Sequence, residues 1–248
     1  MKLIVNADDY ALDLSTSQAI LSAFANGWIS STTCMANMPD FDICMRKAAE
    51  AGVLDRMGVH LNLTQGSPLT DDIRKNKRFC NSDGVFHGHI ARMSYLNRRS
   101  RTDVQTELQA QIDRLRSYGV AITHADSHHH IHTAPWIYLC VRQVLRRSGV
   151  SAVRISNTCS VSSVPKKLYK RWFCWQLRHD GFRTTDAFGN YRDLPLICIQ
   201  SVGTAELETH PVMTDGRVRN KVGTGYDDFQ NGILLHPYHL DEEKETQT

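Results

Sequence analysis

The chain has 248 residues, of which 41% are hydrophobic and 22% are charged, a composition ordinary for a soluble globular protein. Its 29 lysines and arginines exceed its 26 acidic residues by only 3, too few to indicate a nucleic-acid partner. The length suits one large α/β domain, and we expect residues 1–248 to form a single domain.

The cysteines and the hydropathy of the chain indicate where it works. Seven cysteines, odd in number and without a Cys-x-x-Cys pair, are typical of reduced thiols in a cytoplasmic protein. No stretch approaches the roughly 20 apolar residues of a membrane helix, and the apolar run at the amino terminus is too short for a signal peptide. We therefore expect a soluble, cytoplasmic protein that does not bind membranes.

The first sixty residues alternate between strand-like and helical patterns. Strands are predicted at 2–6, 31–36 and 57–63, and helices at 15–26 and 41–51. Ser15 is the predicted N-cap of the first helix, and Gly27 ends it. The order βαβαβ favours a parallel sheet covered by helices, either a barrel or a doubly wound sheet.

The middle of the chain changes character twice. Residues 64–101 are rich in Gly, Pro, Asn and charge, which indicates loops around a site. A helix is predicted from Thr102, which has the capping-box form, to the turn before Gly119. A strand at 120–125 and a helix at 135–147 follow. Beyond Ser156 the pattern is weaker, with strand candidates at 195–200, 206–210 and 232–236.

Chemically reactive side chains follow three of these predicted strands. Asp8 and Asp9 follow the first strand, His60 lies near the end of the third, and residues 126–132 read Asp-Ser-His-His-His-Ile-His. The carboxyl ends of parallel strands meet at one face of a sheet, so these groups should lie close together. Asp9, His60 and one histidine of the cluster would supply the three ligands of a hydrolytic metal site with a position open for water.

Each of these residues also has a structural interpretation. Two acids after a strand often form a turn, and His60 alone could be a hydrogen-bonded core histidine. The cluster differs, because four imidazoles and a carboxylate in seven positions are costly to bury unpaired. In an extended segment His128, His130 and His132 would point one way and His129 the other, so some would orient ligands rather than bind metal.

The remaining histidines carry weaker signals. His124 is interpreted as structural. The His210-Pro211 and His236-Pro237 pairs are more often turns than acid catalysts. The absence of a Gly-x-Ser-x-Gly motif argues against a serine nucleophile.

The motifs together resemble the YdjC-like carbohydrate deacetylases, whose best-described members are chitooligosaccharide deacetylases. Five ordered blocks carry the resemblance: Ile4 to Tyr10, Ser31 to Thr33, Gly58 to Thr70, Thr123 to His132, and Glu208 to Pro211. The resemblance implies a distorted (β/α) barrel of the polysaccharide-deacetylase type that removes acetyl groups from small N-acetylated sugars. It also implies one divalent metal ion, such as Mg²⁺ or Zn²⁺, and a homodimer.

The resemblance also implies roles for particular residues. Asp9, His60 and His128 would be the metal ligands. Asp8 would be the general base and His210 the acid, and His130 and His132 would orient the ligands or contact the substrate.

The sequence departs from the family pattern in two places. Tyr10-Ala11 stands where Phe-Gly is usual, and Val212 stands where Gly or Ala usually follows His-Pro. From about residue 212 the carboxyl-terminal part is atypical. Two alternatives therefore stand beside the deacetylase: a non-catalytic metal- or sugar-binding homologue, and a metallohydrolase of another amide or ester.

Overall fold

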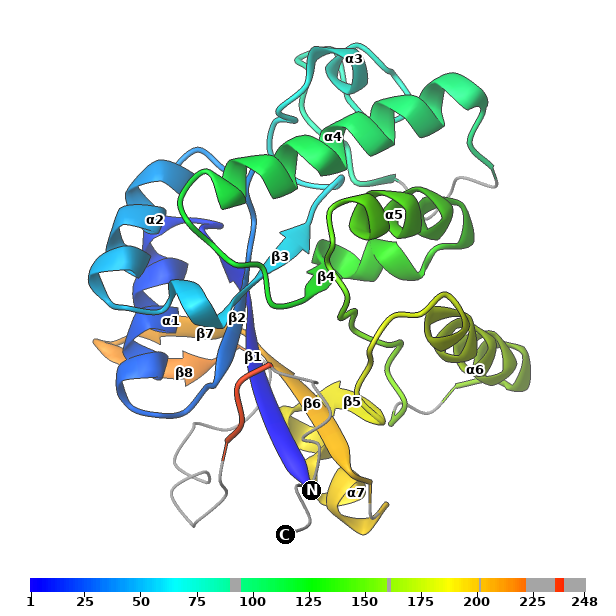
Figure 1. Cartoon of the computed structure of the whole chain (residues 1–248). Coiled ribbons are helices and arrows are strands. Elements are labelled where there is room, and N and C mark those ends of the chain that lie inside the picture. Colours follow the sequence, from blue (N-terminus) through cyan, green and yellow to red (C-terminus); the bar gives the residue numbers. More distant parts are fainter. Residues whose placement is uncertain (90–94, 160–161, 201, 222–234, 239–248) are drawn as a thin grey trace, which may run out of the picture.

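The computed structural model describes residues 1–89, 95–159, 162–200, 202–221 and 235–238, and Figure 1 traces the whole chain. A six-stranded parallel sheet lies at its centre, in the order β4-β3-β2-β1-β6-β5. The strands are β1 (Lys2–Tyr10), β2 (Ser31–Cys34), β3 (Met57–Leu61), β4 (Ala125–Ser127), β5 (Ala187–Asn190) and β6 (Thr204–Thr209). Most of their residues are buried, as expected for a parallel sheet covered on both faces.

Residues 151–154 lie between edge strand β4 and the segment that precedes the other edge strand, β5. On one side the backbone N–H of Ala125 in β4 donates to the carbonyl oxygen of Ala152 at 2.9 Å. On the other side, the N–H of Val153 donates to the carbonyl of Arg183 at 3.0 Å, just before β5. Both bridges are parallel, like the strands of the sheet. With this segment the curled sheet forms a distorted barrel. The expected (β/α) barrel is confirmed, in preference to a doubly wound sheet.

Helices cover the outside of the barrel (Figure 1). They are α1 (Leu14–Ala25), α2 (Phe41–Glu50), α3 (Asp71–Arg74), α4 (Arg98–Arg116), α5 (Pro135–Arg147), α6 (Val164–His179) and α7 (Leu194–Ile199), with short 3₁₀ turns η1 (Leu54–Arg56), η3 (His128–Thr133) and η4 (Tyr191–Asp193). None of the helices in these described ranges combines the length and apolar character needed to cross a bilayer.

Two predicted helix starts were wrong because a better cap lies upstream. Asp13, not Ser15, caps α1 by accepting from the N–H of Thr16 at 2.7 Å. Asn97, not Thr102, caps α4 by accepting from the N–H of Ser100 at 2.8 Å. Thr102 lies inside the helix instead, where its hydroxyl donates to the carbonyl of Arg98. The rule that small polar residues cap helices holds, but the sequence offered more than one candidate.

Three further predictions need correction or fall outside the described residues. The segment 195–200 is not a strand, because it forms most of α7, with Pro195 in the first helical turn. The strand predicted at 120–125 is shorter and shifted, since only β4 is extended there. Of the strand predicted at 232–236, residues 232–234 lie outside the described residues, while Leu235 forms an isolated bridge with Leu3.

A small hairpin and a short return segment follow the barrel. Strands β7 (Pro211–Thr214) and β8 (Arg217–Asn220) pair antiparallel, and β7 packs against α1. Residues 235–238 return to the amino-terminal end of β1, where the N–H of His236 donates to the carbonyl of Leu3 at 2.8 Å. The other end of β1 carries Asp8 and Asp9.

Candidate metal centre

The two adjacent acids at the end of β1 contact different neighbours. In a regular strand Asp8 and Asp9 would point to opposite faces. Here Asp9 has a φ of 69°, and the register with β2 shifts between Ala7 and Tyr10. This bulge turns both carboxylates into the same end of the barrel, as bulges next to active sites commonly do.

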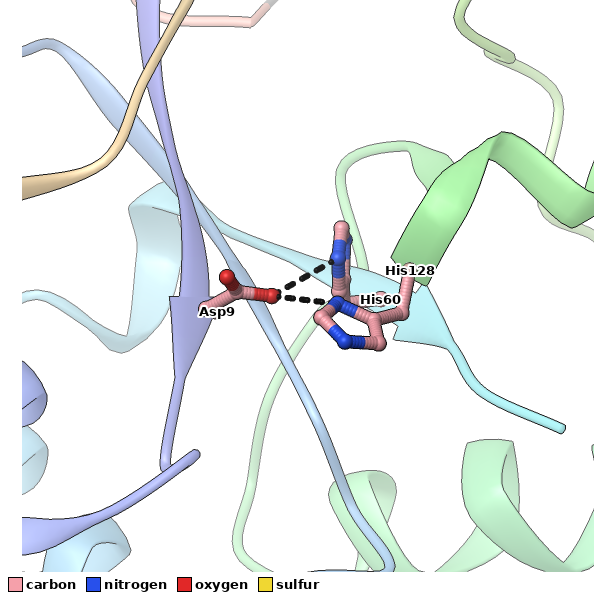
Figure 2. Close-up of side chains that lie close together, drawn as sticks. All are labelled: Asp9, His60 and His128. Atoms are coloured by element: carbon pink, nitrogen blue, oxygen red, sulfur yellow. Dashed lines mark hydrogen bonds and ion pairs between the residues drawn. The ribbon is translucent and has the colours of Figure 1, made fainter. Parts of the chain in front are cut away.

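Asp9 meets two histidines, as Figure 2 shows. Its Oδ1 lies 3.1 Å from Nε2 of His60 on β3 and 2.8 Å from Nδ1 of His128 on η3. One donor atom from each of the three residues lies within 4.8 Å of the others, and all three residues are buried. One carboxylate and two imidazoles are a common donor set for Zn²⁺ and similar divalent ions.

His60 is oriented by groups behind it. Its Nδ1 lies 2.7 Å from Oδ1 of Asp126 and 3.1 Å from the hydroxyl oxygen of Thr33. Because Nδ1 donates to Asp126, Nε2 is the nitrogen that faces Asp9 and would bind a metal ion there. Carboxylates in this position fix the ring and tautomer of metal-binding histidines.

His128 is oriented in the opposite sense by the side chain of Gln65. Its Nε2 lies 2.9 Å from Oε1 of Gln65, so Nδ1 is the nitrogen free to bind. The loop that carries Gln65 is itself held, because the amide nitrogens of Asn62 and Asn37 donate to the Gln65 carbonyl at 2.7 and 3.0 Å. Each imidazole thus turns its other nitrogen towards Asp9, and a divalent ion bound there would replace the protons that these nitrogens share with Asp9. The residues therefore fit a divalent ion.

The histidine cluster does not form the extended segment that was predicted. It forms η3, with φ values of 53° at His129 and 52° at His130. His129 contacts the hydroxyl of Thr64 at 3.1 Å. The buried His132 faces the hydroxyl of Ser127 at 2.6 Å and the carbonyl of Arg154 at 3.2 Å, away from Asp9. The prediction that His128, His130 and His132 share one side was therefore wrong.

Asp8 is held by Arg154, a residue that the sequence analysis missed. The fully buried guanidinium binds both oxygens of Asp8, with Nη1 and Nη2 at 2.6 and 2.7 Å. Nη1 also lies 2.8 Å from Oδ2 of Asp126, and Nε donates to Oε1 of Glu206 at 2.6 Å. A lone arginine in the mostly apolar run from Val150 to Ile155 was the available signal, because buried arginines are almost always paired.

A second set of possible donors, from Asp8, His60 and Asp126, also lies close together. In this set both carboxylates already bind the guanidinium of Arg154. A cation between them would be repelled by that fixed positive charge, which the interior screens poorly. The set around Asp9 is therefore the better metal site.

Burial and pairing oppose each other in the pKa values of the site. Burial alone would raise the pKa of both acids. Arg154 outweighs burial at Asp8, and the hydrogen bonds from His128 and His60 outweigh it at Asp9, so both pKa values lie below the ordinary range. Burial would lower the pKa of His60, but Asp126 and Asp9 raise it well above its ordinary value. Both carboxylates therefore remain charged at neutral pH.

Alternate residues of β6 face the same end of the barrel. Glu206 lies deepest and binds Arg154, and Glu208 follows it with Oε2 at 3.5 Å from Nε2 of His130. His210 comes last, with Nε2 at 4.0 Å from Oδ2 of Asp9 and a side chain that is 28% exposed. β6 therefore carries two acids, and the residue just after it a histidine, towards the candidate metal centre.

The two other histidines considered in the sequence lie elsewhere. His124 is buried and its ring stacks on that of Tyr238, with centroids 3.6 Å apart. His236 lies beside Leu3, at the opposite end of β1 from Asp9. Neither belongs to a candidate metal set among the described residues.

Comparisons with known proteins identify the family of this chain. A family model described as YdjC-like protein matches residues 2–244. A carbohydrate deacetylase of Listeria monocytogenes serotype 4a (strain HCC23) is 30% identical over 223 residues, covering 88% of this chain and 84% of the relative. A carbohydrate deacetylase of Geobacillus stearothermophilus is 39% identical over 144 residues, covering 58% of this chain and 56% of the relative.

A solved structure supports the fold. A crystal structure from Enterococcus faecalis V583, whose description refers to cellobiose-phosphate cleavage, superposes with a TM-score of 0.71 at 24% identity. The match covers 86% of this chain and 82% of the other. Likeness at this level of identity concerns the arrangement of strands and helices, not the reaction.

Proposed function

Because the chain belongs to the YdjC-like family, we propose that it is a metal-dependent carbohydrate deacetylase that removes N-acetyl groups from small acetylated sugars such as chitooligosaccharides. The family resemblance seen in the sequence is confirmed, and the curated relatives are carbohydrate deacetylases. The choice of small chitin-derived sugars as substrate is our proposal, as is a homodimer of single-domain chains.

The observation that carries the proposal is the convergence of Asp9, His60 and His128 beside a second, ionised carboxylate. Asp9 and the two imidazoles would hold the metal ion. A divalent ion bound there supplies Lewis-acid polarisation of an amide carbonyl and lowers the pKa of water. The mixed oxygen and nitrogen donors suit Zn²⁺, Mn²⁺ or Co²⁺, and Mg²⁺ less naturally.

Asp8 is the proposed general base. Its bidentate pair with Arg154 and the hydrogen bond from Nδ2 of Asn6 at 2.9 Å fix the carboxylate in one orientation. The same contacts lower its pKa, so Asp8 is ionised and ready to accept a proton, although they also make it a weaker base. Proton transfer to Asp8 therefore depends on water whose own pKa has been lowered.

His210 is the proposed acid. An amine leaves an acetamide poorly unless its nitrogen is protonated, so a proton donor must reach the leaving group. His210 lies beside Asp9 and is partly exposed, which leaves its ring accessible to a bound sugar. Its position after β6 is set by the alternation that also brings Glu206 and Glu208 to the barrel interior.

Acetate release from diacetylchitobiose tests the proposal. Protein loaded with Zn²⁺, Mn²⁺ or Mg²⁺ should release acetate, and a chelator should abolish the reaction. Simple acetate esters assayed in parallel distinguish a sugar deacetylase from a general esterase. Metal binding without acetate release from any acetylated sugar would favour the non-catalytic alternative.

The Asp8→Asn variant tests the base. We expect it to lose at least about a hundredfold in kcat, within the usual contribution of a general base, and to bind metal nearly as well as the wild type. Asp13→Asn is the matched control, because Asp13 follows β1 as the N-cap of α1 and Asn also caps helices. Wild-type turnover in Asp8→Asn would remove the base assignment.

A further inference from the structure

Glu208 differs from its neighbour on β6 in how its oxygens are used. Glu206 uses both, since Oε1 accepts from Arg154 at 2.6 Å and Oε2 accepts from the hydroxyl of Tyr238 at 2.9 Å. Oε2 of Glu208 is buried but has no hydrogen-bond partner in the described part of the chain. Leaving a buried polar atom unpaired costs about 1–3 kcal/mol, so such an atom needs a reason.

The two nearest nitrogen donors do not hydrogen-bond to this oxygen. Nη1 of Arg154 lies 3.7 Å away, and its two protons already point to Oδ2 of Asp8 and Oδ2 of Asp126. Nε2 of His130 lies 3.5 Å away, which exceeds the 2.7–3.2 Å of an ordinary N–H···O bond. Glu208 is therefore surrounded by polar groups without being hydrogen-bonded by them.

His130 is more exposed than Glu208, whose Oε2 is buried. The side chain of His130 is 47% exposed and that of Glu208 is 14% exposed, so His130 lies at the rim and Glu208 below it. Burial, with the nearby charge of Asp8, raises the pKa of Glu208 to about 8. At neutral pH the carboxyl group is mostly protonated, and it can both donate and accept a hydrogen bond.

We propose that Glu208 and His130 form a subsite that binds one hydroxyl group of the sugar ring and so selects the substrate. Because Oε2 of Glu208 is buried, the exposed ring of His130 must turn aside to admit a hydroxyl group, whose oxygen can then lie within hydrogen-bond distance of both residues. A hydroxyl group donates and accepts, which matches the two partners. This inference rests on the proposed function, whose substrate is a sugar, and assigns a task to an acid that the deacetylation itself does not use.

Sugar binding by Glu208 variants tests the subsite. Calorimetry with metal-loaded protein and chitobiose, which has no acetyl group to hydrolyse, gives Kd without turnover. Glu208→Leu should weaken Kd about tenfold and raise KM for diacetylchitobiose by a similar factor, with kcat within about threefold of wild type. Glu208→Gln should stay within about threefold, because an amide also donates and accepts.

A matched control and a substrate series sharpen the test. Thr209→Val removes another buried, unpartnered hydroxyl from the same strand and should leave Kd unchanged. One monodeoxy analogue of chitobiose, which lacks the hydroxyl group bound by the subsite, should bind wild type about tenfold more weakly than chitobiose does. The same analogue and chitobiose should bind Glu208→Leu equally well.

The outcomes separate the subsite from the reaction. A normal Kd for Glu208→Leu, or a loss of kcat with unchanged Kd, overturns the subsite even where wild type releases acetate. Failure of wild type to bind chitobiose overturns it as well. Glu208-dependent sugar binding without acetate release would support the subsite and remove the deacetylase function.

Discussion

Asp8 and Asp9 show how neighbouring residues of one type acquire different chemistry. Asp8 faces a guanidinium that cannot lose its proton, whereas Asp9 faces two imidazoles that can. An imidazole that gives up its proton becomes a metal ligand, while a guanidinium does not. The partners, and not the carboxylates themselves, suit Asp9 to bind the metal ion and keep Asp8 ionised and fixed in place as the proposed base.

Gln65 gives a prediction at the level of one hydrogen bond. Its Oε1 holds the proton of His128 on Nε2 and keeps Nδ1 free. Gln65→Leu should therefore weaken metal binding about tenfold, in the usual range for groups that orient metal ligands. Thr64→Val is the control, because Thr64 contacts His129, which is not in the candidate metal set. Equal metal affinity of both variants in a calorimetric titration would contradict the prediction.

The residues that sequence reasoning found and missed differ in their local signals. Asp8, Asp9, His60 and the cluster lie at the ends of recognisable strands, so their meeting could be predicted. Arg154 lies 146 residues from Asp8, and nothing near it in the sequence indicates which acid it binds. Gln65 and Glu208 lie within blocks that carry the family resemblance, but nothing in those blocks indicates which groups they contact. Their contacts exist only after the barrel closes, and the roles assigned to the predicted site residues stay predictions.

Among the secondary-structure elements, η3 shows the limit of local patterns. Alternation was a sound rule for an extended segment, but His129 and His130 both adopt positive φ, which is uncommon for residues other than glycine. Contacts with Thr64 and Glu208, distant in the sequence, accompany this conformation. By contrast, the long periodic helices and buried strands of the first half follow their own sequence and were largely predicted.

Gly58 gives a prediction for β3, the strand that carries His60. A Cβ at Gly58 would lie 2.7 Å from the backbone oxygen of His124 and 2.6 Å from its ring. Gly58→Ala should therefore push the two segments apart, lower the free energy of unfolding by about 1–3 kcal/mol and weaken metal binding by moving His60.

Gly203→Ala is the control for this change. Its added Cβ would meet only a carboxylate oxygen of Asp186, at 3.3 Å. Urea denaturation and metal titration measure both effects. If Gly58→Ala were as stable as Gly203→Ala, the close approach of β3 to residue 124 would not limit stability.

In the molecule as a whole, the barrel interior is filled partly by titratable groups, so stability should depend on pH. Burial lowers the pKa of both His124 and His132 to about 3, against about 6.5 in an unfolded chain. Between these values the unfolded chain takes up protons that the folded protein refuses, so acidification lowers the free energy of unfolding. Glu206 acts oppositely between about 4.5 and 7, because burial raises its pKa to about 7.

His132→Asn isolates one of these groups. With a chelator present, the plot of unfolding free energy against pH between 4 and 6 should be shallower for the variant by about one proton, or about 1.4 kcal/mol per pH unit. The slope is informative even where the substitution itself costs stability. The exposed His179, changed to Asn, is the control. Parallel curves for His132→Asn and wild type would mean that His132 is protonated in the folded protein.

Tyr238 connects the end of the described chain to the base. Tyr238 is only 2% exposed, and its ring stacks on that of His124. Its hydroxyl group donates to Glu206. Glu206 in turn binds Arg154, and Arg154 binds Asp8. Tyr238→Phe keeps the ring and should cost about 1 kcal/mol, whereas Tyr238→Ala leaves a cavity beneath the network and should cost about 3–5 kcal/mol. The alanine variant should also have a lower kcat, because Glu206 would lose its hydrogen bond from Tyr238 and would position Arg154 and Asp8 less firmly. The exposed Tyr95, changed to Ala, is the control for urea denaturation and acetate release. If Tyr238→Ala and Tyr95→Ala had the same unfolding free energy and the same kcat, neither the stability of the barrel nor the activity of Asp8 would depend on the carboxyl-terminal segment.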